Sequence, residues 1–204
     1  MTKIKICGTT NYKDAMNAVN LGADYLGFNF YKQSPRYIKE QNAKIIIEKL
    51  PQKTKKVGIF VNEDISKIKR TVNFCNIDVI QLSGEENPQF IMDLKKALPN
   101  KVIKSFRVKK ISGIKNINKY KTDYVMLDSF KKGLYGGTGT AFDWRLAKNA
   151  DKKRLFLSGG LNSLNVKLAI HEIKPYAVDV CSSIEHYPGK KDFEKMKEFI
   201  EAAK

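Results

Sequence analysis

The stretch Lys3-Ile4-Lys5-Ile6-Cys7-Gly8-Thr9-Thr10 (residues 3–10) starts with alternating lysine and isoleucine and then has a cysteine followed by glycine. The alternation predicts a short β-strand, and Gly8 predicts the turn that ends it. A cysteine at the carboxyl end of such a strand, ahead of a helix, is where an α/β enzyme presents a reactive group. A buried cysteine that packs as a small hydrophobic residue produces the same pattern. Taken alone, the stretch favours this second interpretation of Cys7.

Similar short apolar runs recur along the whole chain. They comprise residues 4–7, 25–30, 57–61, 79–82, 102–108, 124–128, 155–158 and 177–181, and the intervals leave room for helices. Eight such units predict parallel strands joined by helical crossovers. The expected fold is α/β, a (β/α)8 TIM barrel that forms one domain over residues 1–204. A doubly wound open sheet is the alternative, but the first turn lacks the G-x-G-x-x-G pattern.

Capping residues and the helical spacing of apolar side chains predict helices between the strands. The clearest segments run from Asn11 to Gly22, from Asp64 to Cys75, from Pro88 to Leu98, from Asn162 through Leu164 and Leu168, and from Phe193 to Ile200. Cys75 extends the apolar stripe of its helix, which predicts that its thiol packs in the core. Less regular segments after Pro35, Ser112 and Phe142 also predict helices.

The composition is that of a soluble globular protein, with 204 residues of which 42% are hydrophobic and 10% aromatic. No apolar run approaches the roughly 20 residues that span a bilayer. The first strand starts so early that no signal peptide is expected before it. We therefore expect a cytoplasmic protein with no membrane partner.

Cysteine, histidine and lysine usage narrows the possible functions. Cys7, Cys75 and Cys181 lie far apart and form no C-x-x-C pair, which argues against a disulfide framework and a zinc site. With two histidines, an imidazole metal site is not expected either. The net charge of +17 raises the hypothesis of nucleic-acid binding, but the lysines are spread over nearly every segment. This spread predicts solvated helix faces and no nucleic-acid partner; a weaker interpretation is attraction of an anionic small substrate.

In a (β/α)8 barrel the functional groups lie at the carboxyl ends of the strands. The candidates there are Cys7, Arg36 beyond the second strand, Asp128, Gly159 and Gly160 after the seventh strand, and Ser182 and Ser183 after the eighth. Barrel enzymes often bind phosphate with the loops after strands 7 and 8, where glycines let backbone N–H groups approach the anion. The paired glycines alone would indicate a tight turn. Their place in the seventh unit, with small polar residues after the eighth strand, favours a phosphate site.

Asp128 follows four apolar residues and fits either a helix cap or, partly buried at a strand end, a general acid. Cys7 and Asp128 would then be a base and an acid on different strands. Arg36 suits a substrate carboxylate, because a guanidinium binds a planar anion with two hydrogen bonds. The loop Gly136-Gly137-Thr138-Gly139 lacks the P-loop ending, and we expect a mobile flap or a close-approach turn there. A small substrate with both phosphate and carboxylate fits these residues better than a nucleic acid.

At these residues the chain closely resembles the phosphoribosylanthranilate isomerase family of tryptophan biosynthesis. The matching stretches are residues 5–10, 22–28, 34–37, 81–85, 127–129, 136–139 with 142–144, 157–161, 178–185 and 188–192. The resemblance implies an Amadori rearrangement of N-(5-phosphoribosyl)anthranilate to open-chain 1-(2-carboxyphenylamino)-1-deoxyribulose 5-phosphate, without cofactor or metal. It implies that Asp128 protonates the furanose ring oxygen, that Cys7 removes the C2 proton and that Arg36 binds the anthranilate carboxylate. It also assigns the phosphate to Gly159, Gly160, Ser182 and Ser183. We expect a monomer or a homodimer.

Three residues depart from this family. Ser83 stands where histidine is common, Ser183 where glycine is common, and Cys181 where serine is usual. The Ser183 side chain could crowd a phosphate, or its hydroxyl could donate to the anion instead. A thiolate base also needs a lowered pKa; a positive environment around Cys7 would supply it, but no sequence pattern identifies the residues that would create it.

Two alternatives remain at this point. One is a related phosphate-binding barrel such as indole-3-glycerol-phosphate synthase, whose chemistry depends on strand-end lysines. Lys104 lies within the fifth strand, but this alternative leaves Cys7 and Asp128 without a role. The remote alternative is a basic, non-catalytic nucleic-acid-binding protein, which predicts an affinity that falls steeply with salt.

Overall fold

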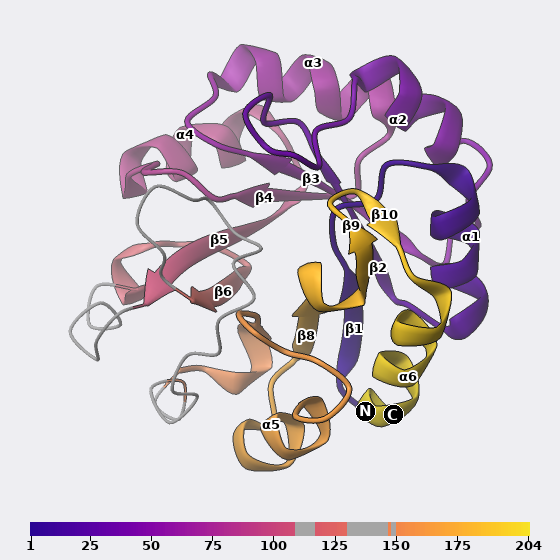
Figure 1. Cartoon of the computed structure of the whole chain (residues 1–204). Coiled ribbons are helices and arrows are strands. Elements are labelled where there is room, and N and C mark those ends of the chain that lie inside the picture. Colours follow the sequence, from indigo (N-terminus) through magenta and orange to yellow (C-terminus); the bar gives the residue numbers. More distant parts are fainter. Residues whose placement is uncertain (109–116, 130–146, 148–149) are drawn as a thin grey trace.

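The computed structural model describes residues 1–108, 117–129, 147 and 150–204. Within them, eight parallel strands form a closed barrel in chain order, with β1 beside both β2 and β8 (Figure 1). The strands are β1 (Lys3–Ile6), β2 (Tyr25–Asn29), β3 (Lys55–Phe60), β4 (Val79–Leu82), β5 (Lys101–Val108), β6 (Tyr124–Ser129), β7 (Leu155–Leu157) and β8 (Ala177–Val180). Every predicted strand corresponds to one of these, so the prediction of a (β/α)8 barrel is confirmed.

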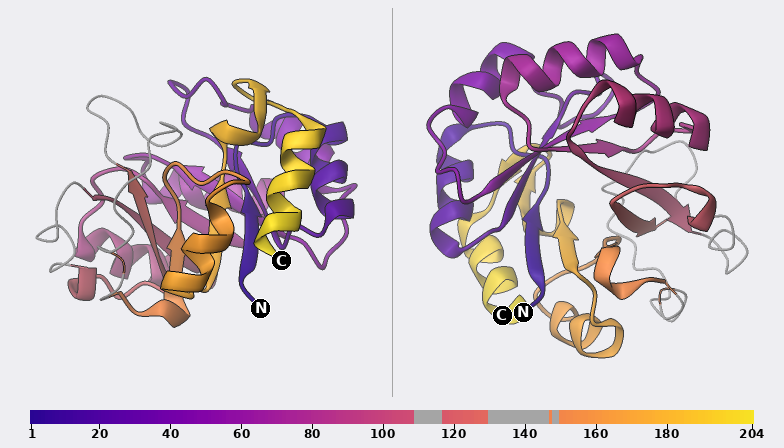
Figure 2. Two further views of the ribbon diagram at one scale, coloured as in Figure 1. Left: turned by 60° about the horizontal axis from the view of Figure 1, so that its bottom comes forward. Right: turned by 180° about the vertical axis from the view of Figure 1, so that it is seen from behind.

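The described helices lie outside the barrel and alternate with its strands (Figure 2). They are α1 (Tyr12–Leu21), α2 (Glu40–Ile47), α3 (Ile65–Cys75), α4 (Pro88–Ala97), α5 (Val166–Ile173) and α6 (Phe193–Ala203). Three short 3-10 turns, η2 (Ile117–Lys119), η4 (Lys152–Arg154) and η5 (Ser182–Ile184), accompany them. A small hairpin of β9 (Glu185–Tyr187) and β10 (Lys190–Lys191) follows β8 and was not predicted.

Local sequence explains where several helices begin and end. The Asn11 side chain accepts a hydrogen bond from the backbone N–H of Asp14 at the start of α1, and Gly22 ends this helix with a φ of 102°. Asp64 caps α3 in the same way, and Pro88 is the first residue of α4. Such caps satisfy N–H groups that lack a partner inside the helix, and each contributes about 1 kcal/mol. The predictions for these three helices are confirmed.

The prediction for the helix after Asn162 is wrong in its start and in its buried face. The Asn162 side chain accepts hydrogen bonds from the backbone N–H groups of Leu164 and Asn165, which holds a turn there. α5 therefore begins only at Val166. Leu164 and Leu168 are 94% and 55% exposed. The buried stripe consists instead of Val166, Ala169 and Ile173.

The remaining helix predictions have different outcomes. α2 confirms the helix expected after Pro35. α6 confirms the last helix, although Phe193 itself is exposed. The helices expected after Ser112 and Phe142, and the loop at 136–139, lie outside the described residues and stay predictions.

Side chains on alternate positions of the strands enter two different cores. On β1, Ile4 and Ile6 pack against the surrounding helices, whereas Lys5 and, directly after the strand, Cys7 face the barrel interior. The interior near the starts of the strands is filled by Tyr25, Val57, Val79, Ile103, Tyr124, Met126, Phe156 and Ala177. Removing such apolar surface from water contributes roughly 25 cal/mol per Å². Mainly apolar side chains therefore fill this end of the barrel, and the residues predicted to form the site line a cavity at the other end.

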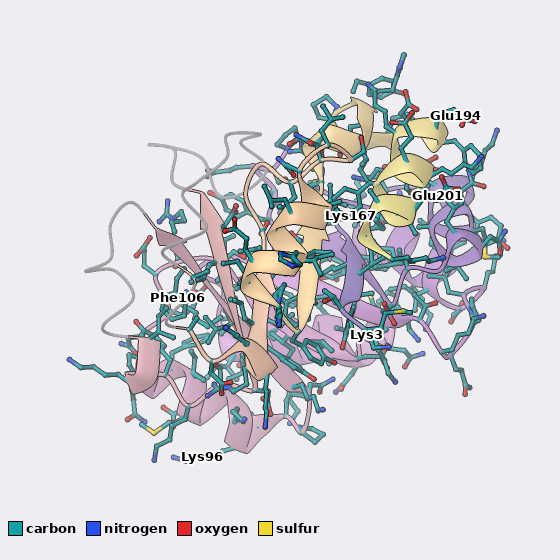
Figure 3. All side chains as sticks on the ribbon, turned by 90° about the horizontal axis from the view of Figure 1, so that it is seen from below. Lys3, Lys96, Phe106, Lys167, Glu194 and Glu201 are labelled. Carbon is teal, nitrogen blue, oxygen red and sulfur yellow. The ribbon has the colours of Figure 1, made fainter. Side chains whose placement is uncertain are left out.

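Charged side chains are distributed over the outside of the barrel. Each of the six described helices carries at least one lysine. Lys96 on α4, Lys167 on α5 and Glu194 on α6 are exposed on separate helices (Figure 3). This distribution agrees with the solvated helix faces expected from the sequence. No helix among the described residues is long and apolar enough to cross a membrane.

Candidate active site

The predicted site residues gather at one end of the barrel. A single cavity at the carboxyl ends of the strands is lined by Cys7, Arg36, Asp128, Gly159, Gly160, Ser182 and Ser183, which are all the residues predicted. Asn29, Gln81 and Arg107 also line the cavity. The first and last strands share this site because the barrel closes β1 onto β8.

Cys7 comes directly after β1 and is not packed as a core residue. Its backbone N–H donates to the carbonyl of Val180 across the β1–β8 junction at 2.9 Å. Its side chain is half-buried and faces the cavity. Cys75, in contrast, is 1% exposed in the core beneath α3, as predicted. The interpretation of Cys7 as a buried core thiol is therefore wrong.

Beside Cys7 the barrel interior contains a buried ion pair that the sequence analysis missed. Lys5 Nζ lies 2.6 Å from Asp179 Oδ1, and the Ser158 hydroxyl donates to Asp179 Oδ2 at 3.0 Å. Burial opposes the charge on Lys5, but Asp179 and the neighbouring Cys7 raise the pKa of Lys5 above its ordinary value. A signal was available in the sequence. A charged residue interrupts both the first and the last apolar run, and these strands must meet when a barrel closes.

The surroundings of Cys7 lower the pKa of its thiol to about 6. The largest cause is a hydrogen bond from the Cys181 thiol, which stabilises the Cys7 thiolate. Burial and the carboxylate of Asp179 act in the opposite direction, whereas the ammonium groups of Lys5 and Lys191 favour the thiolate. The same hydrogen bond to Cys7 raises the pKa of Cys181 well above its ordinary value. Two lysines therefore contribute the positive charge expected around Cys7, although a hydrogen bond is the larger cause of the lowered pKa.

Arg36 is held in place by a carboxylate. Its Nε and Nη2 donate to the two oxygens of Glu185, at 2.9 Å and 2.6 Å. Lys191 Nζ lies 3.0 Å from Glu185 Oε1 and donates to the carbonyl of Cys7 at 2.5 Å. Although burial opposes it, Arg36 and Lys191 lower the pKa of Glu185, so the carboxylate stays ionised. Since Glu185 and Lys191 belong to β9 and β10, the unpredicted hairpin links Arg36 to Cys7.

Gly8 allows these groups to approach one another. Its φ is 74°, a left-handed value that favours glycine. A Cβ atom at this position would stand 2.7 Å from Arg36 Cδ and 3.0 Å from Cys181 Sγ. A larger residue would therefore push Arg36 away from the cavity.

Asp128 belongs to β6, which does not neighbour β1 in the barrel. It is 7% exposed, and it lines the cavity together with Arg107, its partner in the β5–β6 register. Asp128 lies within the strand, because β6 continues through Ser129. The interpretation as a helix cap therefore does not fit, and a buried carboxyl group on the cavity wall is what the structure contains.

The two loops expected to bind phosphate face the same cavity. Gly159 and Gly160 have φ values of 85° and 73°, so the turn after β7 depends on glycine. Ser182 and Ser183 start η5 directly after β8 and Cys181. The Ser183 hydroxyl donates to the carbonyl of Leu161 at 2.5 Å and thereby ties the two loops together. Donation to an anion would require this hydroxyl to rotate.

Gln81 supplies a buried acceptor to the cavity. Its Nε2 donates to Ser83 Oγ at 3.1 Å, whereas Oε1 has no hydrogen-bond partner among the described residues. A buried amide oxygen without a partner destabilises a protein by about 1–3 kcal/mol. A hydroxyl group of a ligand in the cavity can satisfy it.

Lys104 does not line this cavity. Its Nζ lies 2.8 Å from Glu86 Oε2 and donates to the carbonyl of Gly84 at 2.7 Å. Lys104 therefore belongs to a buried ion pair away from the cavity and does not provide the strand-end lysine that the synthase alternative requires.

A closed eight-stranded parallel barrel with a polar cavity at the carboxyl ends of its strands defines a (β/α)8-barrel enzyme. Its thiol, carboxyl and guanidinium groups suit acid–base chemistry on an anionic small molecule.

Known proteins with similar sequences narrow this class. A sequence model of the family described as N-(5'phosphoribosyl)anthranilate (PRA) isomerase matches residues 4–202. The N-(5'-phosphoribosyl)anthranilate isomerases of Pelobacter propionicus and Trichlorobacter lovleyi are 43% and 42% identical to this chain; the alignments cover all of it and 96% and 98% of those proteins. The chain belongs to the phosphoribosylanthranilate isomerase family and is an isomerase of the Amadori type. The resemblance noted in the sequence is confirmed.

Solved structures of the same family resemble this chain over its whole length. A crystal structure of phosphoribosyl anthranilate isomerase from Thermotoga maritima has a TM-score of 0.90 and 37% identity, covering 100% of this chain and 98% of that one. A crystal structure of phosphoribosyl anthranilate isomerase in complex with reduced 1-(O-carboxyphenylamino)-1-deoxyribulose 5-phosphate has a TM-score of 0.87 and 37% identity, covering 100% of this chain and 98% of that one.

Proposed function

We propose that this protein catalyses the Amadori rearrangement of N-(5-phosphoribosyl)anthranilate to 1-(2-carboxyphenylamino)-1-deoxyribulose 5-phosphate in L-tryptophan biosynthesis. The observation that carries the proposal is that Cys7, with its lowered pKa, and Asp128 line one cavity. Family membership supports the same substrate. The ligand in the related crystal structure supports a substrate with a phosphate and a carboxyl group.

In the proposed mechanism Asp128 is the general acid and protonates the furanose ring oxygen. The bond from C1 to that oxygen breaks while the nitrogen lone pair forms a Schiff base with C1. The Cys7 thiolate then removes the proton from C2, which the adjacent iminium makes acidic. The resulting enolamine tautomerises to the ketone. No atom is gained or lost overall, as an isomerisation requires.

Arg36 is the proposed ligand of the anthranilate carboxylate. Because Glu185 orients the guanidinium with two hydrogen bonds, little side-chain entropy remains to be lost on binding. Arginine has five N–H donors, so donors remain for a substrate carboxylate.

The proposed phosphate site consists of Gly159, Gly160, Ser182 and Ser183. The left-handed backbone of the two glycines supports close approach of an anion to their N–H groups. The net charge of +17 supports attraction of a substrate that carries both a phosphate and a carboxylate.

The test is a fluorescence assay of phosphoribosylanthranilate consumption by the wild type and by Cys7→Ala and Asp128→Ala. We expect each variant to fold normally, by circular dichroism, and to lose about 10²–10⁴-fold in kcat. Cys75→Ser is the matched control, because Cys75 lies away from the cavity and its thiol donates to the carbonyl of Glu40, a bond that a serine hydroxyl can also make. Full activity in Cys7→Ala or Asp128→Ala would remove the role assigned to that residue.

A further inference from the structure

Two of the three cysteines lie side by side at the seam of the barrel. β1 and β8 are neighbours (Figure 1), with Ile6 paired to Val180. Cys7 and Cys181 come directly after these two residues, just beyond the ends of the strands, and the backbone N–H of Cys7 still donates to the carbonyl of Val180 at 2.9 Å. Both side chains face the cavity, in the same alternation as Lys5 and Asp179. Neighbouring strands are about 4.8 Å apart, and disulfides join residues whose Cα atoms are about 4.4–6.8 Å apart. The two positions are therefore within the distance that a disulfide can bridge.

The two thiols also meet in an arrangement that favours oxidation. Cys181 Sγ lies 3.0 Å from the position that a Cβ atom on Gly8, the residue after Cys7, would take, and it donates to Glu185 Oε1 at 3.8 Å. A hydrogen bond between the two thiols is also the largest cause of the lowered pKa of Cys7. Lys191 Nζ lies 3.9 Å from Cys181 Sγ and binds the carbonyl of Cys7. Both thiols are half-buried on the wall of the open cavity, where a small oxidant can reach them. A reactive thiolate beside a second thiol is the arrangement found in redox-sensing cysteine pairs.

Cys75 has none of these properties. It is 1% exposed, its thiol donates to the carbonyl of Glu40 at 3.4 Å, and burial raises its pKa. It therefore serves as an internal control for oxidation of a cysteine in the same protein.

We propose that Cys7 and Cys181 are a modification site for hydroperoxides, at which oxidation joins the two residues in a reversible disulfide. The Cys7 thiolate attacks the terminal oxygen of ROOH; an S–O bond forms, the O–O bond breaks, and the leaving alkoxide takes up a proton. Cys181 then loses its proton and attacks the Cys7 sulfur, so that the S–S bond forms and the S–O bond breaks. The departing hydroxide becomes water with that proton. Two thiols and one hydroperoxide thus yield one disulfide, one ROH and one water, with two electrons passing to the peroxide.

The disulfide would occupy Cys7 and block the cavity at this wall. The loss of activity that follows rests on the proposed catalytic role of Cys7, whereas formation of the disulfide does not. A dithiol such as dithiothreitol reverses the modification by thiol–disulfide exchange. The pair depends on Cys181, the residue that stands where the family usually has serine.

The experiment treats the folded wild type, Cys181→Ser and Cys75→Ser with hydrogen peroxide and then blocks free thiols with iodoacetamide. Mass spectrometry of the intact protein and of its non-reduced peptides detects a Cys7–Cys181 cross-link as the loss of two hydrogen atoms. Isomerase activity is measured before oxidation, after oxidation and after dithiothreitol, relative to the same untreated variant. We expect the wild type and Cys75→Ser to form the cross-link, to lose at least about tenfold in activity and to recover it with dithiothreitol.

In Cys181→Ser we expect no cross-link, oxidation of Cys7 to sulfinic acid, and no recovery with dithiothreitol, because that oxidation state is irreversible. Oxidised wild type that carries Cys7 sulfenic or sulfinic acid without the cross-link would overturn the proposal, even if Cys7→Ala is inactive. A cross-link with undiminished activity would support the disulfide and refute the catalytic role of Cys7. The two hypotheses can therefore fail separately.

Discussion

Lys5 and Asp179 form an ion pair across the seam where β1 meets β8, with 2.6 Å between Lys5 Nζ and Asp179 Oδ1. Cys7 and Cys181 are two residues further along the chain than Lys5 and Asp179, directly after the ends of the same two strands. Because Lys5 is fully buried, water screens its charge little; its ammonium lowers the pKa of Cys7, and the Asp179 carboxylate raises it by a smaller amount. This pair therefore links closure of the barrel to the protonation state of the proposed base.

The pH dependence of the reaction should report the ionisation of Cys7. Its pKa in the folded protein is about 6, lower than the ordinary thiol value of about 8.5. We expect kcat/KM, and the rate at which iodoacetamide alkylates Cys7, to rise as the pH increases through this value. The pKa of Cys7 is lower in the folded protein than in the unfolded chain, so ionisation of Cys7 stabilises the fold. This contribution is complete above the unfolded-state pKa and is lost as the pH falls towards about 6. Alkylation with an ordinary thiol midpoint would contradict the prediction.

Replacing Lys5 by methionine should raise the pKa of Cys7 and shift its alkylation profile to higher pH. The same change leaves Asp179 buried without its counter-charge, which we expect to lower the free energy of unfolding by about 3–5 kcal/mol. Urea unfolding measures the stability, and mass spectrometry of alkylated Cys7 measures the shift. Lys3→Met is the matched control, because Lys3 starts the same strand but pairs with Asp24 on the surface. An unchanged alkylation profile in Lys5→Met would rule out this action of Lys5.

Arg36→Lys should weaken substrate binding more than it slows the chemical step. A lysine cannot keep two hydrogen bonds to Glu185 and also present a planar fork to a carboxylate. We expect KM to rise at least about tenfold with a smaller change in kcat, which steady-state kinetics will separate. Arg70→Lys, on the exposed face of α3, is the control and should leave both constants unchanged. If KM stays at its wild-type value in Arg36→Lys, Arg36 does not bind the substrate.

Alanine at Gly159 or Gly160 should disrupt the proposed phosphate site. Both residues have a left-handed backbone conformation, in which a Cβ atom destabilises the fold by about 1–2 kcal/mol. We expect inorganic phosphate to inhibit the wild type competitively and to raise its Tm, because a ligand at 100 times its Kd stabilises a protein by about 2.7 kcal/mol. Both effects should weaken in the variants.

Gly22→Ala is the control for the backbone strain that a Cβ atom causes at Gly159 or Gly160. Gly22 also has a left-handed backbone conformation, but it ends α1 away from the cavity. It should lose stability and keep the response to phosphate. A wild type that phosphate neither inhibits nor protects would show that these loops do not bind phosphate.

Much of the fold could be predicted because strands and helix ends depend on neighbouring residues. The alternation in residues 3–7 and the caps at Asn11 and Asp64 are patterns of this local kind. The error at Asn162 is also local in origin. Its side chain binds two backbone N–H groups and holds a turn where the leucine spacing alone indicated a helix.

Sequence patterns alone predict the barrel and the strand-end positions of Cys7, Arg36 and Asp128, because the topology of parallel strands brings all their carboxyl ends to one side. The charges around Cys7, in contrast, depend on how the chain folds. Lys5 and Asp179 are 174 residues apart in the chain and become partners only when the barrel closes. The physical reason is that strand and helix patterns depend on order along the chain, whereas electrostatic interactions depend on distance in space and on burial.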